Sequence, residues 1–292
     1  MSETIKDLDA GDKIQERNRS WWNQTPMSYD WREKITLAEG TREFFDEVDS
    51  RFYSSSPFYR AAQPYGRLIP FAQLKDKRVL EIGCGLGLHS QLMAEAGARL
   101  TSIDLTPRAV DLTGKRLALK GLKSDVRLMD AEKMEFADNE FDFVWSWGVI
   151  HHSAHTERIV SEVFRILKPG GEFRSMVYHK RSINALGIMT MGLLTGKFFK
   201  GLSAEDVFNI YSDGYYARFY TGSEFTKMLG QHGFSIKDVK ILGQKSELVP
   251  IPGSGLSGRV KYTVVPVIPD ALAEKILALV GGFLFVTAQK RV

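Results

Sequence analysis

The feature that most limits the fold of this chain is a regular alternation of apolar and helical segments between residues 78 and 177. The expected strands cover residues 79–82, 99–103, 125–128, 141–146 and 172–177, and the expected helices cover 88–96, 107–120 and 156–167. Strands that alternate with helices in this way form parallel βαβ units. The alternation therefore predicts an α/β fold with a doubly wound, mostly parallel sheet.

A glycine-rich loop joins the first expected strand to the first expected helix. It contains Gly83, Gly85 and Gly87, and glycine lets the backbone turn sharply and approach a ligand closely. Asp104 follows Gly83 by twenty-one residues at the end of the second strand, where an acid accepts hydrogen bonds from ribose hydroxyls. The position after Gly87 holds leucine, so the dinucleotide pattern G-x-G-x-x-G is absent. Glu81 would repel a pyrophosphate and suits a cationic amino-acid group instead.

These features resemble the class I S-adenosylmethionine-dependent methyltransferases, which have a Rossmann-like fold. The glycine loop matches their first motif, and Asp130-Ala131, the segment 141–152 and the turn 165–171 match later motifs in the same order. The resemblance covers residues 78–177. It implies S-adenosylmethionine as methyl donor, S-adenosylhomocysteine as product, and a seven-stranded sheet whose last strand is antiparallel.

The resemblance also implies which residues contact the cofactor. The glycine loop would line the methionine part and the sugar, Asp104 would hold the ribose, and Asp130 would bind the adenine edge. The expected cofactor residues are Glu81, Gly83, Cys84, Gly85, Gly87, Asp104, Leu105, Asp130, Ala131, Ser146, Trp147 and Gly148, with Tyr29 and Trp31 as a lid. Alternatives stay open for four of them: Glu81 as a satisfied strand-end acid, Cys84 as a small buried residue, and Tyr29 and Trp31 as packing residues.

Two adjacent histidines follow the fourth expected strand. His151 and His152 are the candidate catalytic residues, and His151 suits a general base because imidazole titrates near neutral pH. The alternative is that one or both begin the next helix and bond to the backbone. No other histidine or carboxylate lies at zinc-ligand spacing from them, so we expect no metal.

The residues after the fourth strand bear on the methyl acceptor. The loop reads Ser146-Trp-Gly-Val149 rather than the [Asn/Asp]-Pro-Pro-[Tyr/Phe] run of enzymes that methylate base nitrogens. We therefore expect a small-molecule acceptor, first of all an oxygen of a sugar or secondary metabolite. The alternative is a lipid or quinone-like acceptor at a membrane surface, supported by the uncharged segment 182–196. An RNA or protein methyltransferase is less favoured.

The aromatic and basic residues that follow the fifth expected strand are candidates for binding the acceptor. They are Tyr178, Arg181, Tyr215, Tyr216 and Arg218. An acidic or phosphorylated acceptor would suit the two arginines. The alternatives are that Arg218 pairs with Asp213 and that the tyrosines belong to the core.

The remaining sequence suggests how the chain is divided. We expect a helical extension or lid at 1–75, the cofactor-binding core at 76–178, a cap for the acceptor at 179–232, and closing strands with a Pro/Gly-rich insertion at 233–292. The net charge of +4 without a basic-aromatic stripe argues against a nucleic-acid partner. A single cysteine and the lack of an apolar run of about 20 residues predict a cytoplasmic protein without a transmembrane segment. Peripheral membrane contact and a homo-oligomer remain open.

Overall fold

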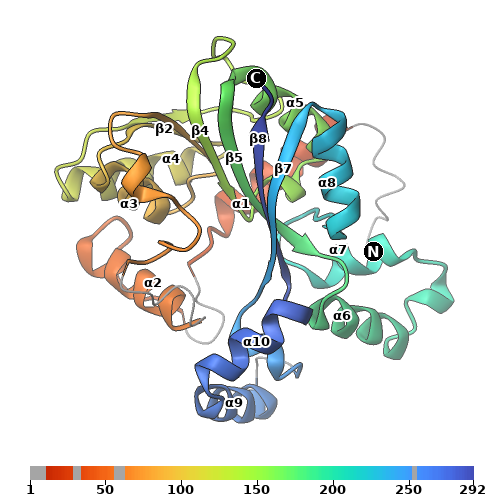
Figure 1. The fold of residues 1–292 in the computed structure, drawn as a ribbon. Helices are drawn as coiled ribbons and strands as arrows, with labels where there is room; N and C mark the ends of the chain where they lie inside the picture. The colour runs from red at the N-terminus through yellow and green to blue at the C-terminus, as the bar shows by residue number, and fades with distance from the viewer. Residues whose placement is uncertain (1–10, 29–33, 56–62, 252–254) are drawn as a thin grey trace.

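The computed structural model describes residues 11–28, 34–55, 63–251 and 255–292. The expected lid residues Tyr29 and Trp31 lie outside these ranges. The described chain forms one sheet with helices on both faces, and Figure 1 shows the strands side by side at the centre of the molecule.

The sheet follows the order β3-β2-β1-β4-β5-β8-β7. Its strands are β1 (Arg78–Ile82), β2 (Arg99–Asp104), β3 (Asp125–Leu128), β4 (Phe141–Trp147), β5 (Leu167–His179), β7 (Phe234–Leu242) and β8 (Phe283–Lys290). The first five are mutually parallel, whereas β8 runs antiparallel to both β5 and β7. This confirms the expected doubly wound sheet with an antiparallel last strand. A two-residue strand, β6 (Phe219–Tyr220), adds to the end of β5.

Neighbouring residues of each central strand point to opposite faces of the sheet. Val144 packs against the helices α5 (Thr156–Ile166) and α8 (Gly222–Gln231). Phe143 and Trp145 pack on the other face, with Met93 of α3 (Leu88–Glu95) and with residues 65–74. Because successive side chains of a strand alternate between faces, an apolar run such as 141–147 must be covered on both sides.

The helices between the strands begin where the sequence places them. α4 (Pro107–Leu119) has Pro107 in its first turn, and the Thr106 hydroxyl accepts a hydrogen bond from the Ala109 N–H at 3.3 Å. The uncharged segment 182–196 forms α6 (Ile183–Leu194), capped by the Ser182 hydroxyl. It is followed by α7 (Ala204–Tyr211).

One expectation about local structure was wrong. The turn expected at 168–171 is part of β5, because the pairing with β4 resumes at Glu172 after an irregularity that accommodates the extra residues. The Pro/Gly-rich insertion, for which the sequence predicted no element, contains the helix α9 (Gly255–Val264). Pro269 precedes α10 (Asp270–Val280). Figure 1 shows α9 and α10 together at the bottom, with α6 beside them.

The N-terminal helices are α1 (Gly11–Gln24) and α2 (Arg42–Ser55), and α2 is fixed to the sheet domain by an ion pair. Arg116 on α4 is only 2% exposed, and its Nη1 donates to Asp49 Oδ1 of α2 at 2.9 Å. Arg116 Nε also donates to Gln91 Oε1 at 2.8 Å. Phe45 of α2 packs beneath the guanidinium at 5.3 Å. The buried guanidinium therefore has a charged partner on α2 and a polar partner on α3.

Replacing Asp49 by asparagine tests this ion pair. Asp49→Asn leaves the buried Arg116 charge without its counter-charge, and we expect the free energy of unfolding to fall by about 3 kcal/mol. Urea denaturation followed by circular dichroism measures this change. The matched control is Asp46→Asn on the exposed side of the same helix, which we expect to change stability by less than about 0.5 kcal/mol. Equal effects of the two substitutions would contradict the account.

Candidate active site

A cavity of about 750 Å³ lies at the carboxyl ends of the parallel strands. Its wall includes Gly83 after β1, Asp104 at the end of β2, Gly148 after β4 and Tyr178 near the end of β5. Open α/β sheets bind ligands at this edge, and the volume is typical of a site for a small molecule. Residues of α1, α2 and α6 complete the wall.

The glycine loop forms one side of this cavity. Gly83 and Gly85 have φ angles of +78° and +54°, which side-chain-bearing residues rarely adopt. A Cβ on Gly83 would lie 2.2 Å from Val149 Cγ2, so only glycine fits there. A Cβ on Gly85 would meet no atom within 4 Å, because that position faces the open cavity. A ligand can therefore approach the loop backbone directly at Gly85.

Asp104 is held in a fixed orientation beside the loop. Its Oδ2 accepts a hydrogen bond from the Gly85 N–H at 3.1 Å. Its Oδ1 accepts from the N–H and the hydroxyl of Thr106, both at 2.9 Å. Burial raises the pKa of the Asp104 carboxyl above its ordinary value, while these hydrogen bonds oppose the rise. The carboxylate is thus oriented toward the cavity before any ligand binds.

A second carboxylate, Asp130, follows β3 on the same side of the cavity. Its Oδ1 accepts hydrogen bonds from the Glu132 N–H at 2.8 Å and from Gln15 Nε2 at 3.0 Å. Leu105 and Ala131 line the wall next to it. Gln15 belongs to α1, so the N-terminal helix covers this part of the cavity.

The expected cofactor residues divide into two groups. Those that line the cavity are Gly83, Cys84, Gly85, Asp104, Leu105, Asp130, Ala131, Trp147 and Gly148. Glu81, Gly87 and Ser146 do not line it. Glu81 is 1% exposed and accepts hydrogen bonds from the hydroxyls of Ser90 and Ser102. These contacts agree with the alternative that Glu81 is a hydrogen-bonded acid at the end of the strand. Gly87 packs against α4, and Ser146 is buried within β4.

The two candidate histidines have different surroundings. His151 is fully buried, its ring lies 4.0 Å from the ring of Tyr178, and it does not line the cavity. Burial also lowers its pKa well below the ordinary value. A group without access to the cavity cannot take a proton from an acceptor there, so the structure does not support the expectation that His151 is the base.

His152, in contrast, lines the cavity. Its Nδ1 lies 2.7 Å from the carbonyl oxygen of Tyr216. Because a carbonyl only accepts, Nδ1 carries the proton and Nε2 keeps the lone pair. Nε2 has no hydrogen-bond partner among the described residues. Burial lowers the pKa of His152, and the charge of Asp213 partly opposes this shift. His152 is therefore neutral at neutral pH, and its Nε2 is a buried nitrogen without a partner among the described residues.

We name the part of the cavity that is lined by β5, α6, β8 and the segment 244–251 the acceptor lobe. Its apolar lining residues are Trp147, Met176, Tyr178, Ile183, Ile188, Met191, Phe219, Ile251 and Phe283, and its polar ones include Asn184, Asp213, Gln244, Glu247 and Lys261. The Tyr178 hydroxyl donates to Asp213 Oδ1 at 2.5 Å. This bond orients the phenol group at the wall of the lobe.

Most of the expected acceptor residues lie outside the cavity. Tyr178 lines it, whereas Arg181, Tyr215, Tyr216 and Arg218 do not. Arg181 is exposed, and the Tyr215 hydroxyl accepts a hydrogen bond from Arg17 Nη1 of α1 at 2.7 Å.

Arg218 does not pair with Asp213, which was the alternative that the sequence left open. Its Nη2 donates to the Tyr216 hydroxyl at 2.9 Å, while Asp213 bonds to Tyr178 instead. Tyr216 also contacts α1, because its N–H donates a hydrogen bond to the side-chain oxygen of Asn18 at 3.1 Å.

The sequence predicted a helical extension or lid at 1–75 but did not identify the residues of α1 that line the cavity. Gln15, Asn18 and Trp22 line the cavity, and the Trp22 ring lies 4.9 Å from that of His152. The Asn18 side-chain amide also donates to the His152 carbonyl oxygen. The available signal in the sequence was the pair of tryptophans Trp21 and Trp22 in a mostly polar helix, which indicates that this helix packs on another part of the chain.

The described residues contain no cluster of three or more His, Cys, Asp or Glu side chains that could hold a metal ion. Burial raises the pKa of the Cys84 thiol well above its usual range, so this cysteine is a poor nucleophile. Within the same described ranges, every helix is too short or too polar to span a bilayer. The cytoplasmic location stays a prediction.

Comparison with known proteins agrees with the fold and the cavity. The methyltransferase domain family matches residues 80–174. A ubiquinone biosynthesis O-methyltransferase of Aromatoleum aromaticum is 31% identical over 200 residues, which cover 66% of this chain and 78% of that protein. The enzyme of the same name from Coxiella burnetii is 28% identical over 169 residues, covering 57% of this chain and 67% of its own.

The fold also matches a solved structure, that of magnesium protoporphyrin IX methyltransferase from Synechocystis with bound S-adenosylhomocysteine. The TM-score is 0.58 at 15% identity, with 95% of this chain and 99% of that chain covered. The fold and the site define a Rossmann-like methyltransferase. The chain belongs to the class I S-adenosylmethionine-dependent methyltransferases, and S-adenosylmethionine is its cofactor.

Replacing Asp104 tests the donor end of the cavity. Asp104→Ala removes a preoriented carboxylate, and we expect the dissociation constant for S-adenosylmethionine to rise about 100-fold through the loss of two charge-assisted hydrogen bonds. Isothermal calorimetry measures it. The control is Asp111→Ala on the exposed face of α4, where the carboxylate pairs with Lys115. An unchanged dissociation constant in Asp104→Ala would remove this residue from the site.

Proposed function

We propose that the glycine-loop side of the cavity holds S-adenosylmethionine. The backbone at Gly85 faces open space, which suits the close approach of the donor's sugar and methionine parts. Asp104 suits the ribose hydroxyls, and Asp130, beside Leu105, suits the adenine edge. When bound there, S-adenosylmethionine supplies an activated methyl group and is released as S-adenosylhomocysteine.

We further propose that the acceptor is an apolar molecule with a hydroxyl group, such as a lipid or a reduced quinone. The observation that carries this proposal is the acceptor lobe, whose wall is largely aliphatic and aromatic. A sugar, the first expectation from the sequence, would leave several hydroxyls without partners against such a wall. The names of the relatives from Aromatoleum and Coxiella support the same choice.

The surroundings of α6 support an acceptor that partitions into membranes. Ile188 and Met191 of α6 line the acceptor lobe, while Leu186 and Leu194 of the same helix are 66% and 76% exposed. An apolar helix surface next to a cavity wall would let such an acceptor reach the lobe from a lipid interface. On this proposal, segment 179–232 acts as the cap over the acceptor and α1 of the N-terminal extension acts as the lid over the donor.

In this mechanism His152 removes the proton from the acceptor hydroxyl. Its Nε2 carries the lone pair because Nδ1 donates to the Tyr216 carbonyl. The hydroxyl of Tyr178 is engaged by Asp213, so Tyr178 contributes its ring to the wall that positions the acceptor beside His152. The apolar surroundings exclude water, which keeps His152 neutral and ready to accept a proton.

The test is methylation of a simple apolar hydroxyl compound. We expect the protein with S-adenosylmethionine to convert 4-hexylphenol into its methyl ether, detected by mass spectrometry. Because the lobe binds apolar surface, the KM should fall as the alkyl chain is lengthened from ethyl to hexyl. Methylation of simple glycosides without any methylation of alkylphenols would contradict the proposal.

His152 can be tested with the same reaction. His152→Gln should lower kcat by about 10²- to 10⁴-fold, the usual contribution of general-base catalysis, without changing the affinity for S-adenosylhomocysteine. In the unsubstituted protein kcat should fall as pH drops below 6.5, because His152 becomes protonated at a pKa below the ordinary value. The control is His155→Gln, at the start of α5 and outside the cavity wall. An unchanged kcat in His152→Gln would exclude it as the base.

A further inference from the structure

A half-buried carboxylate lies at the edge of the acceptor lobe, where the mechanism described above does not use it. Glu247 belongs to the short helix η6 (Lys245–Leu248), which follows β7, and its side chain lines the cavity. Gln244, Ser246, Gly282 and Lys261 line the wall around it. The sequence offered no motif that would have marked this residue.

The carboxylate is fixed by the protein backbone. Glu247 Oε1 accepts a hydrogen bond from the Gln244 N–H at 2.7 Å, and Oε2 accepts from the Gly282 N–H at 2.6 Å. Two glycines leave room for it: a Cβ on Gly243 would lie 2.9 Å from Oε2, and a Cβ on Gly282 would lie 3.0 Å from it. One side of the carboxyl group therefore contacts the backbone near Gly243 and Gly282, and Glu247 lines the cavity on the other side.

The charge of this carboxylate is only partly compensated. Burial raises the pKa of Glu247 to about 7, and the charge of Lys261 on α9 opposes the rise. Lys261 is itself partly buried, which lowers its pKa, and its Nζ donates to the Ile251 carbonyl oxygen at 3.2 Å. Among the other charged groups on neighbouring elements, Lys245 on η6 pairs with Asp270 of α10 at 2.9 Å.

His179 on β5 is the remaining titratable group near this corner. Its Nδ1 lies 3.0 Å from the Gly281 carbonyl oxygen, and burial lowers its pKa, so it is neutral at neutral pH. Glu247 and Lys261 are thus the two groups whose charge bears on a ligand here. Their opposite signs favour a neutral ligand over an anionic one, such as the acidic acceptor that the sequence suggested for Arg181 and Arg218.

A carboxylate has about four positions at which it can accept a hydrogen bond. The two backbone N–H groups occupy two of them. In a lobe whose wall is largely apolar, and with Lys261 donating to the Ile251 carbonyl, the ligand group that best satisfies the remaining positions is a neutral hydrogen-bond donor. A buried acceptor that stays unsatisfied costs free energy, so a matching donor on the ligand gains affinity.

We propose that Glu247 is a substrate-binding residue that accepts a hydrogen bond from a second hydroxyl of the acceptor, one that is not methylated. The acceptor is then a neutral, largely apolar molecule with two hydroxyls, one at His152 and one at Glu247. This assignment rests on the proposed function, because it concerns the same acceptor lobe. It adds a polar specificity contact to a wall that is largely apolar.

The test compares 4-alkylphenols with phenols of equal chain length that end in a hydroxyl. Calorimetry measures their affinity for the protein saturated with S-adenosylhomocysteine, over chains from three to eight carbons. In a purely apolar lobe the terminal hydroxyl weakens binding at every length, because its desolvation is not compensated. We expect instead that at least one chain length binds about tenfold more tightly with the hydroxyl at pH 8. A terminal hydroxyl that weakens binding at every length would overturn the inference.

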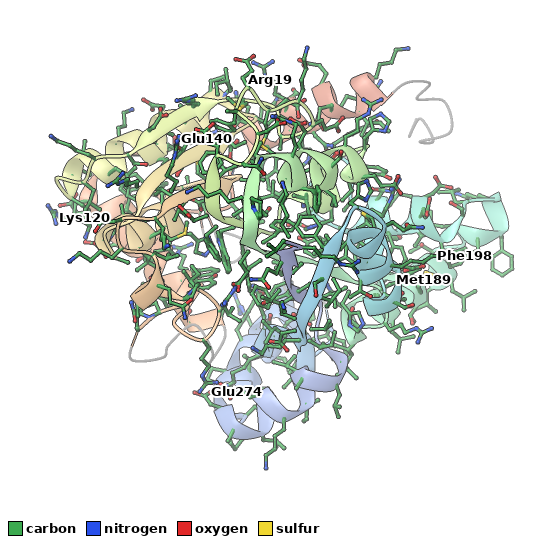
Figure 2. All side chains as sticks on the ribbon, turned by 45° about the horizontal axis from the view of Figure 1, so that its top comes forward. Arg19, Lys120, Glu140, Met189, Phe198 and Glu274 are labelled. Carbon is green, nitrogen blue, oxygen red and sulfur yellow. The ribbon has the colours of Figure 1, made fainter. Side chains whose placement is uncertain are left out.

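Substitution and pH identify the group responsible. Glu247→Leu should abolish the gain, whereas Glu274→Leu on α10, whose charge faces Arg67 outside the cavity, should keep it. Figure 2 shows Glu274 at the end of the molecule away from Arg19 of α1. In the unsubstituted protein the gain should shrink severalfold at pH 5.5, because Glu247 is then protonated while both kinds of phenol remain neutral. This measurement holds even if Glu247→Leu does not fold.

The outcomes separate this inference from the proposed function. A gain that persists in Glu247→Leu overturns the inference, and so does a gain that is the same at pH 5.5 and pH 8. In both cases methylation of 4-hexylphenol would leave the proposed function standing. If alkylphenols neither bind nor react at any length, the proposed function fails and the inference fails with it.

Discussion

The site depends on the hydrogen bond between the Gly85 N–H and the Asp104 carboxylate. It joins the loop after β1 to the end of β2, two segments that parallel pairing already brings to the same edge of the sheet. Gly83 and Gly85 adopt left-handed backbone conformations, which turn the loop around the carboxylate. On this side of the cavity the Asp104 carboxylate is therefore oriented before a ligand binds, and less binding free energy is lost in ordering it.

The acceptor side follows a different physical rule, because its few polar groups are held in an apolar wall. His152 is neutral, and its Nδ1–H donates a hydrogen bond to the Tyr216 carbonyl oxygen. The Tyr178 hydroxyl donates to Asp213. Glu247 is held by two backbone N–H groups. Buried polar groups that are oriented in this way favour ligands with matching polar atoms, and the apolar wall supplies most of the contact area. Both sides belong to one cavity. Residues of α1 line it near Asp104 and Asp130, and residues of α6 and η6 line the acceptor lobe.

The sequence predicted the sheet because its signals are local. Apolar strands, the Thr106 cap and the glycine loop each depend on residues close together in the chain. The glycine loop and Asp104 followed from their spacing, whereas the other expected cofactor residues followed from the family resemblance. Glu81 is buried beneath the loop, where Ser90 and Ser102 satisfy its carboxylate. Whether these residues bind the cofactor stays a prediction.

The acceptor side could not be predicted because it is assembled from distant segments. His152 faces the cavity because a carbonyl 64 residues further along the chain fixes its ring, and Glu247 is held by the backbone 35 residues away. Neither the tautomer nor that contact has a signature in the sequence. The same holds for α1, whose Asn18 bonds to Tyr216 across 198 residues.

The most direct test of the account is a crystal structure of the protein with S-adenosylhomocysteine and 4-hexylphenol. The account predicts that the ribose bonds to Asp104, that the phenol oxygen lies within hydrogen-bond distance of His152 Nε2, and that this oxygen faces the sulfur. The alkyl chain should lie against the aromatic and aliphatic wall of the acceptor lobe. A phenol bound outside the lobe, or an oxygen directed away from both His152 and the sulfur, would contradict the account.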